Sequence, residues 1–305
     1  MSEFALVVGE ALVDEVRAAD GTVTAHPGGS PANVAIGLGR LGRNVELLTW
    51  LGADAYGTLV ANHVQASDVR LAPGSTGAAR TSVAAAVLDD TGAATYQFDL
   101  EWTLPDADVS PGAVVVHTGS IAAVLEPGAS RVLDILHDAR EHATITYDPN
   151  ARPSLMGAPT EALAKVQSVL ALSDVVKVSD EDIEWLTGLS PEAVAPQWLE
   201  LGPRIIVVTR GGEGASAWTG DGRRVDIAAP RVTVADTVGA GDSFMGGLID
   251  GLWSAGLLGA DRREPLAAIP TEVLEHILAR CARIAAITVS RAGANPPSSA
   301  ELGES

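Results

Sequence analysis

The chain has 305 residues, 47% of them hydrophobic, so it can bury a sizeable core and shows no sign of wholesale disorder. Its formal net charge is −19 with only two lysines, Lys165 and Lys177, which argues against nucleic acid and against an anionic membrane as partners. A single cysteine, Cys281, excludes an intramolecular disulfide, and no apolar run reaches membrane-spanning length. We therefore expect a soluble, cytoplasmic protein.

Short apolar, β-branched runs alternate along the chain with stretches of helical periodicity. Candidate strands lie at residues 5–9, 44–50, 113–118, 143–147, 174–178 and 205–209. Helical patterns lie at 30–41, 57–65, 128–141, 160–172, 180–187 and 191–201, followed by 242–255 and 271–290. This alternation predicts an α/β fold with a doubly wound, mainly parallel sheet and helices on both faces. The polar tail, 296–305, is expected to fray.

Two segments break the alternation because neither is paired with a helix. Residues 12–25 contain a polar turn at 19–21, and residues 78–102 contain two strand-like runs, 81–88 and 94–100, separated by a turn signal. We expect two hairpins that form a small β-sheet lid over a cleft. No linker is long enough to divide the chain, so residues 1–305 are predicted to be a single domain with lid segments inserted near 12–26 and 78–102.

The most informative stretch is Ala-Asp-Thr-Val-Gly-Ala-Gly-Asp-Ser-Phe-Met-Gly-Gly, residues 235–247. Its small residues Gly239, Ala240 and Gly241 allow a tight turn that opens a helix, where unpaired backbone N–H groups and the helix dipole favour an anion. A carboxylate at Asp242 makes sense there if it takes a proton from a hydroxyl group that attacks a bound phosphoryl group. The stretch predicts a phosphotransferase site.

A second glycine-rich motif, Pro-Gly-Gly-Ser-Pro-Ala-Asn, begins at residue 27. Gly28 and Gly29 allow a ligand close to the backbone, and Asn33 offers an amide to a hydroxyl-rich ligand. On its own, a plain turn with Asn33 as a helix cap explains the motif equally well. Residues 37–42 match G-x-G-x-x-G but end a helix instead of following a strand, so a dinucleotide site is disfavoured. No P-loop motif occurs, so the commoner way of binding ATP is absent.

Together and in this order, the two motifs resemble the hallmarks of the ribokinase-like (PfkB) family of carbohydrate kinases. The resemblance extends from Gly9 to Asn295 and implies a ribokinase-like fold with a small β-sheet lid. Within the family, the motif at 28–33 and the segment Tyr-Asp-Pro-Asn-Ala-Arg-Pro at 147–153 look most like the fructokinase branch.

The resemblance also implies roles for individual residues. Asp242 would be the general base, and the N–H groups of Gly239, Ala240 and Gly241 would form the anion hole. The sugar site would comprise Asp14, Gly28, Gly29, Asn33, Phe98 and Arg152. The ATP site would comprise Lys177, Thr209, Gly211, Gly214 and Asn295. Mg²⁺ would accompany ATP near Asp182, and a monovalent cation such as K⁺ would bind near Asp236.

Several of these residues have a plainer interpretation of similar weight. Family members often carry Asn-x-x-Glu where this chain has Ser-Asp-Glu-Asp at 179–182, so Asp182 either reaches a water-bridged Mg²⁺ or belongs to a solvated acidic helix start. Lys177 either faces phosphate or lies on the surface, and Arg152 either binds ligand or forms a structural ion pair. Activation by K⁺ at Asp236 is an even alternative to a purely structural role.

The second lid segment indicates the kind of sugar. Residues 96–102, Tyr-Gln-Phe-Asp-Leu-Glu-Trp, carry two acids and no arginine, which disfavours an acidic substrate such as 2-keto-3-deoxygluconate. We expect a small neutral sugar, fructose phosphorylated at O6. Ribokinase and nucleoside kinase activities are alternatives, since Phe98 and Trp102 leave room for a base pocket. A non-catalytic sugar-binding regulator is a rival from another class, and a homodimer paired through the lid is expected.

Overall fold

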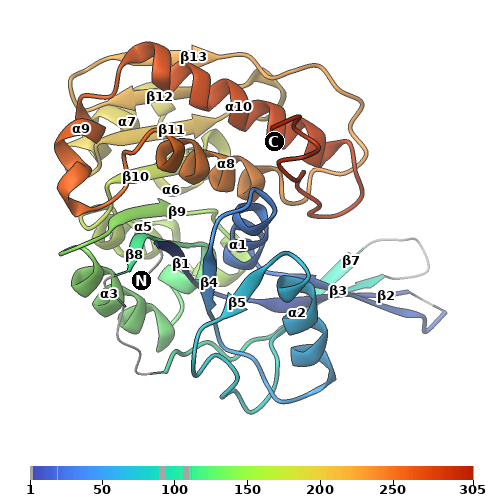
Figure 1. Ribbon diagram of the computed structural model, residues 1–305. Helices are drawn as coiled ribbons and strands as arrows, with labels where there is room; N and C mark the ends of the chain where they lie inside the picture. Colours follow the sequence, from blue (N-terminus) through green and yellow to red (C-terminus); the bar gives the residue numbers. More distant parts are fainter. Residues whose placement is uncertain (1–2, 19, 89–93, 106–109, 111, 305) are drawn as a thin grey trace.

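A nine-stranded sheet forms the centre of the molecule (Figure 1). The protein is described by a computed structural model that covers residues 3–18, 20–88, 94–105, 110 and 112–304. The strand order is β13-β12-β11-β10-β9-β8-β1-β4-β5. The bounds of these strands are β1 (Phe4–Val8), β4 (Val45–Leu48), β5 (Val69–Leu71), β8 (Ala113–Gly119), β9 (Thr144–Asp148), β10 (Val175–Ser179), β11 (Ile205–Thr209), β12 (Ala215–Thr219) and β13 (Arg224–Ile227).

The strands from β11 to β5 are parallel, which confirms the prediction of a doubly wound, mainly parallel sheet. Every residue of β1 and β9 is buried, as continuous apolar strands between two helical layers require. The antiparallel strands β12 and β13 at one edge were not predicted. They form a hairpin whose Asp-Gly turn at 221–222 is a hairpin signal, but no helix lies between its strands, so they fall outside the strand–helix alternation.

Helices cover both faces of the sheet and divide the core in two. One apolar cluster packs under helices α1, α2, α8 and α10, and the other packs under α3, α5, α6 and α7. Neighbouring strand residues alternate between them: Val207 belongs to the first cluster and Val208 to the second. No helix of the described residues is both long and apolar enough to cross a membrane. The helix bounds are α1 (Ser30–Arg40), α2 (Ala55–Gln65), α3 (Gly128–Ala139), α4 (Pro153–Met156), α5 (Pro159–Leu170), α6 (Asp180–Thr187), α7 (Pro191–Leu199), α8 (Ala240–Ser254), α9 (Arg263–Ala267) and α10 (Thr271–Val289).

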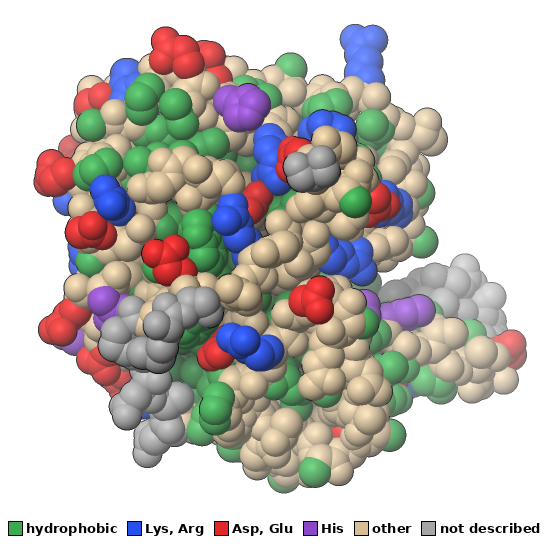
Figure 2. Space-filling model, viewed as in Figure 1, with side chains coloured by type: hydrophobic (Ala, Val, Ile, Leu, Met, Phe, Trp, Pro, Cys, Tyr) green, Lys and Arg blue, Asp and Glu red, His purple; other side chains and the backbone are tan. Residues whose placement is uncertain are grey.

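The two predicted hairpins form one four-stranded sheet in the order β3-β2-β6-β7. Its strands are β2 (Leu12–Arg17), β3 (Val23–Gly28), β6 (Val83–Leu88) and β7 (Ala94–Asp99). Strands β2 and β6 pair in parallel and thereby join the hairpins. The sheet projects from the body (Figure 1) and stands out as an arm in the space-filling view (Figure 2). The turn predicted within 89–92 lies outside the described residues, as does position 19 of the first turn.

The prediction of a frayed C-terminal tail is wrong for residues 296–304. Leu302 is only 3% exposed, and the Ser299 N–H donates to the carbonyl of Arg40 over 3.1 Å. Glu304 lies 2.7 Å from the Arg280 guanidinium. One apolar side chain and two polar anchors are enough to hold a short tail that its polar composition alone would leave free.

Candidate active site

The carboxyl ends of the parallel strands meet at one edge of the sheet. The chain leaves β1 towards β4 and β5 and returns on the other side of β1 as β8, so the topological switch point lies between β1 and β8. The N-termini of α1 and α8 face this edge, where hydrogen bonds join them. The residues at these strand ends are Val8, which Gly9 follows, and Gly119, Asp148, Ser179 and Thr209.

Asp242 lies in the first turn of α8 and is held by three side chains from two other segments. The Ser30 hydroxyl and the Asn33 amide, both on α1, donate to its two carboxylate oxygens over 2.8 Å each. The Asn150 amide donates to Ser30 Oγ over 2.7 Å and to Asp242 over 3.2 Å. Asp242 is 6% exposed. Its carboxylate is therefore fixed in direction.

Backbone strain gathers at the same place. Among the described residues, three non-glycine residues have positive φ. Two of them are Ser120 (55°), the first residue after β8, and Asn150 (37°), the second residue after β9. This conformation is costly for residues other than glycine and persists where surrounding contacts enforce it. At Asn150 it turns the amide towards Asp242.

The turn before α8 has the geometry of an anion hole. Gly239 has φ 75° and lies so close to Ala294 that a β-carbon would stand 2.6 Å from the Ala294 methyl group. Among the described residues, the N–H groups of Gly239 and Gly241 have no hydrogen-bond partner, whereas that of Ala240 donates weakly to the Thr237 carbonyl over 3.3 Å. Unpaired N–H groups at a helix N-terminus are suited to an anion.

Lys177 is buried beside this turn, so its interpretation as a surface lysine is wrong. Its side chain is 4% exposed, and its ammonium group lies 2.7 Å from Asp148. A β-carbon on Gly241 would stand 2.8 Å from the same ammonium group. Burial raises the pKa of Asp148 to about 6, although Lys177 opposes this increase. The other carboxylate oxygen of Asp148 has no partner among the described residues.

Asp14 and the two glycines of the second motif lie together. A β-carbon on Gly28 would stand 2.1 Å from an Asp14 carboxylate oxygen, so Gly28 leaves the space that this carboxylate fills. Gly29 has φ 106°, and a β-carbon added to it would stand 2.5 Å from the carbonyl oxygen of Glu10. The protein displaces water around Asp14 and raises its pKa, while the charges of Arg152 and His26 act in the opposite direction.

Phe98 and Arg152 belong to the surroundings of Asp14. The register of the lid sheet places Phe98 and Asp14 on the same face, and the Phe98 ring stacks on Tyr96 with centroids 6.3 Å apart. The Arg152 guanidinium hydrogen-bonds the Asn150 carbonyl and side chain over 3.0 and 2.7 Å. Arg152 therefore braces the strained turn that orients Asn150, and its charge also acts on Asp14.

Ser179 and Asp182 form different hydrogen bonds at the start of α6. The Ser179 hydroxyl accepts the Asp182 N–H over 3.0 Å and so caps α6. The Asp182 carboxylate accepts the Ala151 N–H over 3.1 Å and ties α6 to the loop after β9. Among the described residues, no cluster of three or more His, Cys, Asp or Glu could hold a metal ion. One or two carboxylates suffice for Mg²⁺ that keeps its waters and binds a phosphate, so Asp182 fits such an ion.

The predicted ATP loop follows β11. Thr209 ends that strand, directly opposite Ser179 in the parallel register. Gly211 (φ 45°) and Gly214 (φ 111°) have backbone conformations that favour glycine, and a β-carbon on Gly214 would stand 2.0 Å from the Ile227 carbonyl. The loop closes when the Arg210 N–H donates to the Gly214 carbonyl over 2.8 Å.

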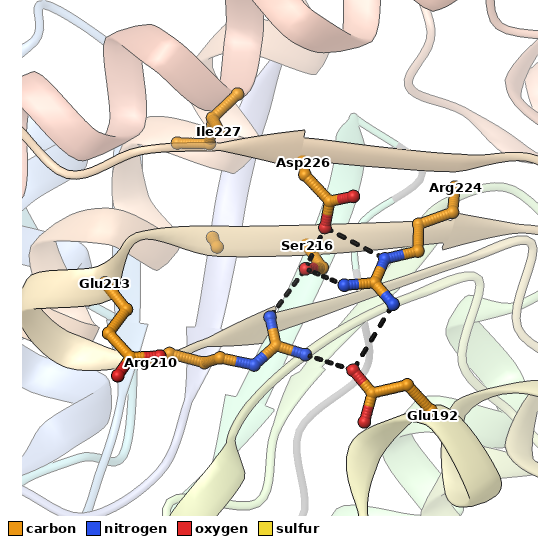
Figure 3. A pocket seen from close by; sticks show the side chains of 8 residues that line it. Glu192, Arg210, Glu213, Ser216, Arg224, Asp226 and Ile227 are labelled. Carbon is orange, nitrogen blue, oxygen red and sulfur yellow. Dashed lines mark hydrogen bonds and ion pairs between the residues drawn. The ribbon is translucent and has the colours of Figure 1, made fainter.

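Next to this loop, on the α7 side of the sheet, lies a pocket lined by charged side chains (Figure 3). The Arg210 guanidinium lies 2.5 Å from Ser216 Oγ and 3.1 Å from Glu192 on α7. Arg224 approaches the same Glu192 oxygen at 3.3 Å. Both guanidinium groups stack over the Trp218 ring, at 5.8 and 4.8 Å from its centroid. The acids in the pocket pair its arginines, so it resembles a structural brace more than a ligand site.

The other two predicted ligand residues have partners within the protein. The Asn295 side-chain oxygen accepts from Arg40 over 2.5 Å. The Asp236 carboxylate accepts the N–H groups of Val238 and Gly293 over 3.0 and 2.9 Å, and these bonds lower its pKa. Asp236 thus ties the turn before α8 to the C-terminal segment.

The sequence analysis assigned no role in ligand binding or catalysis to two residues of this site, Ser30 and Glu10. Asn150 follows a predicted strand and was expected to face the cleft, and its amide contacts Asp242. Ser30 stands in the second glycine-rich motif, where we expected it only to start a helix, although its position could have revealed it. Glu10 has no signal of its own beyond a charge placed after an apolar strand.

Known proteins resemble the chain over most of its length. The family model described as pfkB family carbohydrate kinase matches residues 2–301. A fructokinase of Rhizobium leguminosarum bv. trifolii is 35% identical over 268 residues, which cover 83% of this chain and 81% of the relative. The structure of Xylella fastidiosa fructokinase with bound ATP superposes with a TM-score of 0.85 at 25% identity and covers 99% of this chain and 98% of that one. A Vibrio cholerae fructokinase variant with fructose, ADP and potassium ion has a TM-score of 0.74 at 24% identity, covering 96% and 94%. The chain belongs to the pfkB family of carbohydrate kinases.

Proposed function

We propose that this ATP-dependent sugar kinase transfers the γ-phosphoryl group of MgATP to O6 of fructose. The observation that carries the proposal is the position of Asp242: three side chains fix its carboxylate one residue after the Gly241 N–H, which has no partner among the described residues. A pure binding protein has no use for a base beside an anion hole, which disfavours the non-catalytic alternative.

In the proposed mechanism, Asp242 takes the proton of the sugar hydroxyl as its oxygen attacks the γ-phosphorus in line. The N–H groups of Gly239 and Gly241, with the weaker donor Ala240, stabilise the charge on the phosphoryl oxygens, and the Lys177 ammonium adds positive charge beside them. The lid sheet excludes water, which would otherwise compete as acceptor. Mg²⁺ held near Asp182 would neutralise charge on the phosphate oxygens when bound.

For the sugar, we propose hydrogen bonds to Asp14, Asn33 and the backbone of Gly28 and Gly29, with Arg152 above and Phe98 on the lid. Several carboxylates around this space favour a neutral sugar over an acidic one. The named fructokinases among the relatives favour fructose over ribose, 2-keto-3-deoxygluconate or a nucleoside.

For the nucleotide, we propose Lys177, Thr209, the loop from Gly211 to Gly214, and the segment at Asn295. A monovalent cation near Asp236 is supported by the potassium ion named for the Vibrio cholerae enzyme. Asp236 already accepts two N–H groups, so such a cation would use the remaining oxygen capacity there. A cytoplasmic location completes the proposal, because ATP is available there.

A homodimer through the lid is supported by apolar side chains that are exposed on one face of the small sheet. Tyr96 is 65% exposed, Phe98 37% and Val16 36%, and the strand register places all three on the Asp14 face. Exposed apolar surface of this kind is typical of an interface. A second copy of the lid would cover it.

The test is ADP release from MgATP with K⁺ present, measured with fructose, ribose, 2-keto-3-deoxygluconate, adenosine and no acceptor. We expect a strong signal with fructose only, and phosphorus NMR of the product should place the phosphate on O6. Preference for another acceptor would overturn the choice of fructose but not the kinase. Silence with every acceptor would favour the regulatory alternative.

A further inference from the structure

The two oxygens of the Asp242 carboxylate differ in how many hydrogen bonds they accept. Oδ1 accepts from the Ser30 hydroxyl over 2.8 Å and from the Asn150 amide over 3.2 Å. Oδ2 accepts over 2.8 Å from the Asn33 amide, its sole side-chain donor in the part of the chain that the structure describes. Each carboxylate oxygen has two lone pairs. Both lone pairs of Oδ1 are therefore in use, whereas Oδ2 keeps one that is free.

The orientation of the Asn150 amide follows from its other partner. The Asn150 side-chain oxygen accepts from the Arg152 guanidinium over 2.7 Å. Because a guanidinium group only donates, the oxygen of the amide must face it and the NH₂ group must face the other way. That NH₂ group donates to Ser30 Oγ over 2.7 Å and to Asp242. Arg152 thus determines which end of the amide points at Asp242.

The Ser30 hydroxyl has a fixed direction for a similar reason. Its oxygen accepts from the Asn150 amide, so its hydrogen is left to point at Asp242, 2.8 Å away. Ser30 is only 5% exposed, at the start of α1. Arg152, Asn150, Ser30 and Asp242 therefore form one chain of hydrogen bonds that ends on Oδ1. The strained φ of 37° at Asn150 is the backbone conformation that this chain of contacts enforces.

We propose that Ser30 and Asn150 are positioning residues that occupy one oxygen of the base, so that the proton of the sugar hydroxyl goes to the other oxygen, Oδ2. The inference rests on the proposed function, because it assumes that Asp242 is the base. As the sugar O–H bond breaks, its proton bonds to Oδ2, the hydroxyl oxygen bonds to the γ-phosphorus, and ADP leaves with the electrons of the broken P–O bond. Without the two donors, the carboxylate could turn and present either oxygen at an unproductive angle.

The first test compares Asn150→Gly and Ser30→Ala with the wild type. Glycine tolerates the positive φ at position 150, and alanine is a good helix former, so both variants should fold. Each loses a hydrogen bond to a charged group, so kcat should fall roughly ten- to 100-fold with little change in the KM of either substrate. Asp68→Gly, at an exposed residue with φ 59°, and Ser168→Ala, at an exposed residue of α5, are the matched controls.

The second test shows whether the two residues act through Asp242. In Asp242→Asn the base is already lost, so adding Asn150→Gly or Ser30→Ala should lower kcat by less than about twofold more. A further loss as large as that in the wild-type background would mean a structural role and overturn the proposal, as would wild-type kcat values in both single variants. Near-wild-type turnover of Asp242→Asn alone would overturn the proposed function as well, so the two failures are distinguishable.

The third test needs no turnover. A crystal structure with the non-hydrolysable ATP analogue AMP-PNP and fructose, or whichever sugar the wild type uses best, would locate the hydroxyl nearest the γ-phosphorus. We expect this hydroxyl within hydrogen-bonding distance of the Asp242 oxygen next to Asn33, with Ser30 and Asn150 still bound to the other oxygen. A hydroxyl bound instead to the oxygen next to Ser30 would overturn the proposal.

Discussion

The ammonium group of Lys177 lies 2.7 Å from a carboxylate oxygen of Asp148, and both side chains are buried. The ion pair holds one of only two lysines of this acidic chain against the turn before α8. Burying two charges is costly unless they are paired, so Asp148 stabilises the placement of a cation where the phosphoryl group is proposed to bind.

The contact between Lys177 and Gly241 predicts the effect of one added methyl group. In Gly241→Ala the new β-carbon would stand 2.8 Å from the ammonium group and displace it, so kcat should fall by about 100-fold. Gly37→Ala is the matched control: it is helical, its β-carbon meets no atom within 4 Å, and it should stabilise the fold by about 0.5–1 kcal/mol. Steady-state kinetics and thermal unfolding of both variants check this. A Gly241→Ala variant with the kcat of the wild type would refute the proposal that the Lys177 ammonium group lies beside the transferred phosphoryl group.

Asp242→Asn tests the proposed base. The amide keeps an oxygen that can accept from Ser30 or Asn33, so folding should be preserved, but it cannot take the substrate proton. We expect kcat to fall by about 10²–10⁴-fold with little change in the KM for ATP. Near-wild-type turnover would remove Asp242 from the mechanism. Asp261→Asn, at an exposed site, is the control.

Substitutions of Arg210 and Arg224 distinguish an effect on the proposed ATP loop from an effect on the stability of the whole protein. Both pair with Glu192 and stack on Trp218, but only Arg210 belongs to the loop (Figure 3). Arg210→Leu should raise the KM for ATP by roughly tenfold with the sugar KM unchanged. Arg224→Leu should lower stability to a similar degree and leave the KM for ATP near the wild-type value. Kinetics at saturating sugar distinguish the two.

The pKa of Glu10 predicts how stability depends on pH. Because folding raises this pKa from 4.5 to about 8, the stability contributed by the protonated acid is present below pH 4.5 and lost as the pH rises to about 8. The limiting slope is about 1.4 kcal/mol per pH unit. Glu10→Gln should therefore gain stability over the wild type between pH 5 and pH 8, as urea unfolding at several pH values would measure. A pH-independent difference would mean that Glu10 is ionised throughout.

Tyr96→Asp tests the dimer. A charge at this 65% exposed position on the lid should weaken self-association by at least about tenfold without affecting the fold. Light scattering after size exclusion would show a shift towards monomer. A wild-type protein that is already monomeric at high concentration would contradict the proposed dimer.

The sequence predicted those features that depend on local pattern. Strand β11 begins and ends at the expected residues, 205 and 209, because a run of β-branched residues has one plausible structure. The lid followed from hairpin signals. The parallel contact of β2 with β6 was beyond prediction, because it depends on how two distant hairpins meet.

The site was predictable where chemistry follows from residue type. Asp242 and its glycines could be recognised within one short stretch. Ser30 was not, because 212 residues separate it from Asp242, and its hydroxyl serves equally well at the start of a helix. The burial of Lys177 and Glu10 could not be predicted from the sequence either. Both are charged residue types that usually lie at the surface, and only the packing of other segments encloses them.

The pairing of β2 with β6 has a mechanical consequence. Four segments of the chain connect the small sheet to the body, two from each hairpin. The hydrogen-bonded pairing of β2 with β6 joins both hairpins in one sheet, so they move together. Neither can bend towards the sheet edge while the other stays behind. A displacement at Asp14, on the first hairpin, is therefore passed through the shared ladder to Phe98, on the second.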